Sequence, residues 1–178
     1  LDEIDPENQA NLDATIRRSV ELGINHIETA RGYGCSERQL GQVLPDLPRD
    51  QIIVQTKIGP NEDPKKFEDD FHDSLGRLKL DHVDLLAIHG VNNRETLEWS
   101  IRDGGCFEAA QKLREQGKCR FVGFSTHGPT DVILDAITHG EPETGKGFDY
   151  VNLHWYFIFQ QHWPAIEEAT RRAMGVFI

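Results

Sequence analysis

The sequence has few cysteines, no long apolar run and too few basic residues to balance its acidic ones. Its cysteines are Cys35, Cys106 and Cys119, an odd number at wide spacing, which argues against a disulfide framework and against a paired-cysteine metal site. No stretch approaches the roughly 20 apolar residues of a membrane helix, and the first residues carry neither the basic nor the apolar part of a secretion signal. We therefore expect a protein of the reducing cytoplasm with no membrane partner.

The charge balance limits the kinds of partner further. The sequence has 30 acidic and 19 basic residues, and its formal net charge is −11. A negative charge of this size opposes attraction to the phosphate backbone of a nucleic acid, so no nucleic-acid partner is expected. The eight histidines do not show a zinc-binding spacing such as HxxxH or HExxH, and we predict no metal site.

The length of 178 residues would suit a single domain, and we treat residues 1–178 as part of one barrel domain. The first residue is Leu rather than Met, and the last four residues, 175–178, predict a strand that begins where the chain stops. We therefore expect the chain to be a fragment of a longer protein.

Helices and strands are predicted to alternate along the chain. Asp5-Pro6 offers a helix N-cap followed by proline at the first helical position, and this helix is expected to end at Gly23; Asp63-Pro64 offers a second such start. Apolar residues at helical spacing predict further helices around 67–78, 107–113, 132–137 and 163–173. Short apolar segments predict strands at 24–28, 52–57, 83–89, 119–124 and 150–153.

This order predicts an α/β protein with a parallel sheet, because strands recur about every 30 residues, the length of a βαβ unit. Such units close either as an open doubly wound sheet or as a (β/α)8 TIM barrel, and the absence of a G-x-G-x-x-G turn favours the barrel. Polar residues would converge at the carboxyl face of a barrel, although strands that merely reach the surface also end in polar residues. The predicted strands end at Glu28, Lys57, His89, Ser125 and His154.

The segment after the first predicted strand carries the most specific pattern. Residues 27–34, Ile-Glu-Thr-Ala-Arg-Gly-Tyr-Gly, closely resemble the signature of the aldo-keto reductase superfamily, and Ser36 with Gln39 predicts a capping box for the next helix. Downstream, the strand ends at 55–57 and 85–89 resemble the lysine and histidine strand ends of that family. The resemblance runs from the first helix to the end of the chain, and it implies an incomplete (β/α)8 barrel with about six of the eight strands.

The resemblance also implies a proton-transfer site made of Glu28, Tyr33, Lys57 and His89. Tyr33 is the expected proton donor, because a carbonyl that accepts a hydride needs a proton at its oxygen. A free phenol is a poor acid, with a pKa of about 10, and a nearby ammonium such as that of Lys57 favours loss of its proton. Glu28 is expected to pair with Lys57, and His89 to orient the carbonyl oxygen. The family usually has Asp at the position of Glu28, so the geometry of this pairing is expected to differ.

Hydride transfer requires a cofactor, and the resemblance implies NADPH, with NADH as the alternative. The residues implied for the nicotinamide carboxamide are Ser125, Thr126 and Asn152. Ser125 matches the serine of the family, whereas Thr126 and Asn152 stand where relatives have asparagine and glutamine. The loops that bind the rest of the cofactor in relatives are expected to follow Ile178. The first strand of the barrel is expected to precede Leu1.

Plainer interpretations of the same residues remain open. Tyr33 beside a glycine is typical of a turn, Glu28 with Lys57 of a structural ion pair, and His89 of a hydrogen-bonded core histidine. The aromatic run at 154–157 suits a substrate pocket or packing beneath a loop equally well. Ordinary structural roles are expected for the other histidines, which are His26, His72, His82, His127, His139, His154 and His162.

The main hypothesis is an NAD(P)H-dependent carbonyl reductase that acts on a small aldehyde or ketone, with Tyr33 as the proton donor. An alternative is a regulatory protein of the same superfamily that keeps the cofactor pocket and has little turnover, as potassium-channel β subunits suggest. A third is a relative with an added iron–sulfur tail outside these residues. The sequence does not define the substrate or the oligomeric state.

Overall fold

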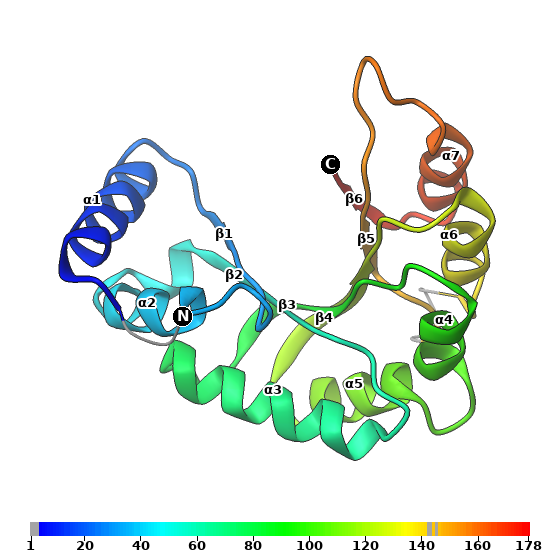
Figure 1. Cartoon of the computed structure of the whole chain (residues 1–178), viewed down its shortest axis with the longest axis horizontal. Coiled ribbons are helices and arrows are strands. Elements are labelled where there is room, and N and C mark those ends of the chain that lie inside the picture. Colours follow the sequence, from blue (N-terminus) through cyan, green and yellow to red (C-terminus); the bar gives the residue numbers. More distant parts are fainter. Residues whose placement is uncertain (1–3, 142–143, 145) are drawn as a thin grey trace.

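The computed structural model describes residues 4–141, 144 and 146–178. These residues form one six-stranded parallel sheet in which the strands lie in chain order. Figure 1 shows that the sheet is curled like part of a barrel wall and that the helices cover its outer side. The strands are β1 (His26–Glu28), β2 (Ile53–Ile58), β3 (Val83–His89), β4 (Cys119–Ser125), β5 (Tyr150–Asn152) and β6 (Gly175–Phe177).

The predicted helices are present, with ends displaced by a few residues, and several start where the sequence indicated. The side chains of Asp5 and Asp63 accept hydrogen bonds from backbone N–H groups of the helices that follow them. The helices are α1 (Pro6–Glu21), α2 (Ser36–Val43), α3 (Pro64–Leu78), α4 (Arg94–Ile101), α5 (Cys106–Glu115), α6 (Thr130–Ile137) and α7 (Trp163–Arg171), with 3-10 turns η1 (Leu44–Asp46) and η2 (Arg49–Gln51).

Two details of the helices differ from the sequence prediction. The helix α4 was not predicted, although Asn93 and Thr96 form a capping box at its start. The capping box predicted for Ser36 and Gln39 is wrong, because Cys35 precedes α2 without a side-chain cap. The Ser36 hydroxyl instead bonds the Thr29 hydroxyl at 2.8 Å, which ties the start of α2 to the segment after β1.

The two faces of the sheet have different environments. The outward side chains pack with the helices in the main core, whose largest fully buried members include Phe67, Phe71 and Phe124. On the inner face, Leu85, Ala87 and Tyr150 form a smaller apolar cluster. Because successive side chains of a strand alternate between faces, the inner face also receives polar residues near the carboxyl ends of the strands.

Close packing of α2 against α3 depends on Gly41. A Cβ atom at this position would lie 2.0 Å from the Arg77 carbonyl oxygen, whereas a Cβ atom at Gly76, within α3, would have no atom within 4 Å. We expect Gly41→Ala to destabilise the protein by about 1–3 kcal/mol through overpacking. Gly76→Ala is the matched control and is expected to be neutral or stabilising by up to about 1 kcal/mol. Urea unfolding of the full-length protein would test this, and equal midpoints for the two variants would contradict it.

Candidate active site

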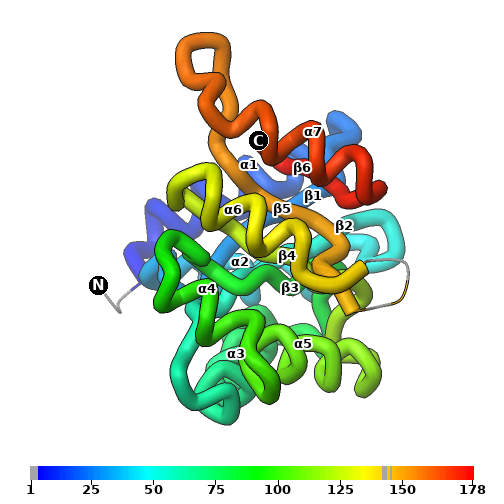
Figure 2. Tube along the Cα trace, turned by 90° about the vertical axis from the view of Figure 1, so that its right-hand side faces the viewer, coloured from blue at the N-terminus to red at the C-terminus, as the bar shows by residue number. Residues whose placement is uncertain are grey.

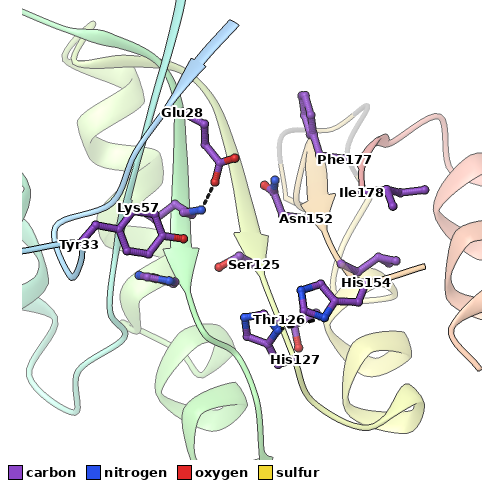
Figure 3. Close-up of a pocket in the computed structure, with 12 residues that line it drawn as sticks. Glu28, Tyr33, Lys57, Ser125, Thr126, His127, Asn152, His154, Phe177 and Ile178 are labelled. Atoms are coloured by element: carbon purple, nitrogen blue, oxygen red, sulfur yellow. Dashed lines mark hydrogen bonds and ion pairs between the residues drawn. The ribbon is translucent and has the colours of Figure 1, made fainter. Parts of the chain in front are cut away.

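One cavity at the carboxyl ends of the strands contains all the residues predicted for the site. Its volume is about 190 Å³. Figure 3 shows that the side chains come from successive strand ends and the loops that follow them. The cavity is lined by Glu28, Tyr33, Lys57, His89, Ser125, Thr126, His127, Asn152, Leu153, His154, Phe177 and Ile178.

The position of Tyr33 is set by the loop between β1 and α2. The backbone of this loop stays paired with β2, since the Arg31 N–H donates to the Lys57 carbonyl oxygen at 3.0 Å. The chain then turns, and the Tyr33 N–H donates to the Ala30 carbonyl oxygen at 3.0 Å. The Arg31 guanidinium forms ion pairs with Asp70 and Asp73 of α3 and so anchors the loop from outside. Sequence reasoning did not identify this anchor.

Lys57 is the most buried charged group of the cavity. Its side chain is 5% exposed, and its ammonium bonds the Glu28 carboxylate, whose side chain is 39% exposed. The longer Glu28 side chain therefore reaches Lys57, as Figure 3 shows. The Lys57 ammonium also lies 4.9 Å from the centroid of the Tyr33 ring. Burial lowers the pKa of Lys57 to about 8, so that it is mainly protonated at neutral pH.

The His89 ring packs edge-on against the Tyr33 ring, with centroids 5.5 Å apart and an interplanar angle of 90°. Burial lowers the pKa of His89, and the positive charges of Lys57 and His127 lower it further. At neutral pH His89 is therefore a neutral imidazole that can donate one N–H bond. The arrangement brings together a phenol, an ammonium and an imidazole donor around one small space.

Ser125 and Asn152 retain donor groups for a ligand, whereas Thr126 does not. The Ser125 hydroxyl oxygen accepts from the Gly90 N–H at 3.2 Å, which leaves its proton for another partner. The Asn152 side-chain carbonyl oxygen accepts a hydrogen bond from the Gln55 amide at 2.9 Å. Asn152 lines the cavity, and its NH2 group has no partner among the described residues.

The Thr126 hydroxyl is used by its own loop. It donates to the Val91 carbonyl oxygen at 2.7 Å and accepts from the Gly128 N–H at 2.9 Å. Thr126 can therefore offer a ligand only an oxygen lone pair, and Asn152 with Ser125 form the better donor set for a carboxamide oxygen.

Sequence reasoning missed a buried polar chain across the inner face of the sheet. Gln55 is fully buried and connects Asn152 to His26, whose Nε2 lies 3.1 Å from the Gln55 carbonyl oxygen. Gln55 precedes Lys57 by two residues and so shares its face of β2. A glutamine at an inward position of an apolar strand was the signal that could have revealed the chain.

The two histidines after β4 and β5 were assigned ordinary roles, and the structure places both in the cavity. The Nδ1 atoms of His127 and His154 are 3.4 Å apart. The residues of the aromatic run at 154–157 have different environments. Trp155 packs against Trp163, with ring centroids 5.7 Å apart. Phe157 is 89% exposed, and its loop stands out from the body of the protein in Figure 2. Only the first residue of the run lines the cavity.

The part of the chain that the structure describes contains no group of three or more His, Cys, Asp or Glu side chains that could hold a metal ion. None of the helices in that part combines the length and the apolar character that a membrane span requires.

The sequence was compared with protein families and curated proteins. The model of the aldo/keto reductase family matches residues 2–164. The chain is 36% identical over 139 residues to L-galactose dehydrogenase of Arabidopsis thaliana, a match that covers 71% of this chain and 42% of that enzyme. It is 28% identical over 148 residues to an NADH-specific methylglyoxal reductase of Escherichia coli strain K12, covering 71% of this chain and 44% of that enzyme. The chain thus spans less than half the length of these two relatives.

The fold was compared with solved structures. An aldo-keto reductase of Bacillus halodurans in its holo form superposes with a TM-score of 0.77 at 20% identity, covering 94% of this chain and 56% of that one. At 20% identity, this similarity is evidence for a shared fold only. Together with the six parallel strands, it confirms the predicted incomplete (β/α)8 barrel.

Proposed function

The chain belongs to the aldo/keto reductase family, and from this premise we propose that the protein reduces a small aldehyde or ketone with a hydride from NAD(P)H. The observation that carries the proposal is the convergence of Tyr33, Lys57 and His89 on one cavity. Preference for NADPH over NADH and a cytoplasmic location are further predictions.

The donor set of the cavity fits a nicotinamide carboxamide. The Asn152 NH2 group, which has no partner in the described part of the chain, and the Ser125 hydroxyl proton both suit its carbonyl oxygen. When bound, the nicotinamide supplies the hydride that no side chain can provide.

We assign proton donation to the Tyr33 hydroxyl and positioning of the carbonyl oxygen to the neutral His89 imidazole. As the Tyr33 proton leaves, negative charge forms on the phenol oxygen, and the Lys57 ammonium near the ring stabilises that charge. The Glu28 carboxylate offsets part of the cost of burying this ammonium.

The direct test is NAD(P)H consumption by the full-length protein with a panel of aldehydes and ketones, followed by absorbance. Turnover of at least one carbonyl is expected. If calorimetry showed tight cofactor binding while the whole panel stayed unreduced, the cofactor-binding regulator would be the better assignment. Two features favour that second candidate: Glu28 stands in place of the usual aspartate, and the Thr126 hydroxyl is engaged within its own loop.

The reaction is expected to slow at alkaline pH because Lys57 loses its charge. The pKa of Lys57 is about 8, so the protonated form predominates at pH 7 and falls about tenfold for each pH unit well above 8. We expect kcat/KM for reduction to follow this fraction between pH 6 and pH 10. In Lys57→Arg the guanidinium stays charged, and the inflection should disappear. An inflection near pH 8 in both proteins would assign it to another group.

A further inference from the structure

His127 and His154 form a close pair at the carboxyl face of the sheet. Their ring centroids are 4.3 Å apart, and the rings meet edge to face at 68°. The Nδ1 atoms approach to 3.4 Å, so that one nitrogen can donate a proton to the other. Both Nε2 atoms lack a partner among the described residues, and both side chains line the cavity beside Ser125 and Thr126 in Figure 3.

The backbone holds both histidines in place. The His127 N–H donates to the Asn92 side-chain oxygen at 2.7 Å. His127 also directly follows Thr126, which is buried and whose hydroxyl donates one hydrogen bond and accepts another. His154 follows Leu153, whose N–H donates to the Phe177 carbonyl oxygen of β6 at 3.0 Å. These bonds fix the backbone positions from which the two imidazoles extend.

The charges around this pair suit an anion. The titratable groups that face it are Lys57, His89 and His162, each of which is positive when charged, and Tyr156, whose ring centroid lies 5.5 Å from that of His154. Glu28 is the only acidic side chain among the described residues that line the cavity, and it is bonded to Lys57. In a chain with a net charge of −11, the described lining of this cavity therefore offers several cation-forming groups and no unpaired acidic side chain.

Without a bound anion, the cavity disfavours a positive charge on His127. Burial lowers the pKa of His127, and the charges of His154 and Lys57 lower it further. An additional proton on the pair would create an imidazolium without a carboxylate partner among the described side chains that line the cavity. A bound anion would supply that partner and would favour uptake of a proton from solvent.

We propose that His127 and His154 bind the carboxylate of the carbonyl substrate, so that the preferred substrates are small oxo acids rather than neutral carbonyls. This inference rests on the proposed carbonyl reduction, because the pair lines the same cavity as Tyr33 and His89. The substrate carbonyl would lie toward Tyr33 and its carboxylate toward the histidine pair. Binding of the carboxylate takes up one proton from solvent, which forms an N–H bond on the histidine pair, and no bond between heavy atoms forms or breaks.

The test compares 4-oxobutanoate with its methyl ester, which has the same aldehyde and no charge. For the full-length protein we expect kcat/KM for the acid to exceed that for the ester by about tenfold or more at pH 6, the effect of one charge-assisted hydrogen bond. This ratio should shrink as the pH rises to 8. The double variant His127→Gln with His154→Gln should bring the ratio close to one at both pH values.

The matched control is His72→Gln, because His72 is exposed on α3 and outside the cavity. It should leave the ratio unchanged. Equal reduction of acid and ester by the unaltered protein, or an unchanged ratio in the double variant, would overturn the proposal.

A second measurement separates the anion site from the reaction. The His127 imidazole is titrated by NMR with and without succinate, and its midpoint should move to higher pH in the presence of the anion. If neither aldehyde were reduced but the midpoint moved, the proposed function would fail and the anion site would stand. A midpoint that succinate does not change would overturn the anion site.

Discussion

Replacing Tyr33 by phenylalanine is expected to lower kcat/KM for carbonyl reduction by about 10²–10⁴-fold, the usual contribution of a general acid. The substitution removes only the hydroxyl, and the ring can keep its contacts with His89 and Lys57. Cofactor affinity and the unfolding midpoint should therefore change little. Stopped-flow or steady-state NAD(P)H absorbance measures the rate, and fluorescence titration measures the affinity.

The chain offers a closely matched control for this variant. Tyr156 is 47% exposed and Tyr33 is 49% exposed, but Tyr156 lies outside the cavity. Tyr156→Phe is expected to retain full activity. Comparable activity of Tyr33→Phe and Tyr156→Phe would show that Tyr33 is an ordinary turn aromatic.

Lys57→Met is expected to lower kcat/KM by about 10²–10³-fold, the range found when one preorganised electrostatic group is removed. Methionine keeps much of the side-chain length and removes the charge. Because a buried ammonium is costly to desolvate and Glu28 is 39% exposed and can be hydrated, stability should be equal or higher. The measurements are kcat/KM and the urea midpoint of the same preparation.

This pair of measurements separates a catalytic role from a structural one. If the Lys57–Glu28 ion pair only held the fold together, the urea midpoint would fall with the activity. Lys65→Met is the control, since Lys65 is exposed on α3 and pairs with Asp69. It should alter neither quantity appreciably, because exposed ion pairs contribute little.

Much of the fold could be predicted because its signals are local. The strands are short apolar segments, and helix starts such as Asp5-Pro6 and Asp63-Pro64 are read from neighbouring residues. The convergence of Tyr33, Lys57 and His89 on one cavity could be predicted for a related reason. Each lies at or just after a strand end, and parallel strands bring their carboxyl ends to one edge of the sheet.

The contacts that could not be predicted depend on how the chain folds and not on a local sequence pattern. Ser36 was expected to cap its own helix, but the fold brings the Thr29 hydroxyl to it instead. Gln55 meets Asn152, 97 positions along the chain, only because the sheet curls. His127 and His154 lie 27 positions apart and carry no recognisable motif, so their proximity depends on the register of β4 and β5.

The chain-order arrangement of the sheet has a consequence for folding. Each strand pairs with the next one in the sequence, so the sheet can grow strand by strand as the polypeptide leaves the ribosome. Once β3 has joined β2, residues up to His89 already place the phenol, the ammonium and the imidazole on one edge. The amide and hydroxyl groups assigned to the nicotinamide follow with β4 and β5. We therefore expect Tyr33, Lys57 and His89 to come together during synthesis before the groups proposed for the nicotinamide.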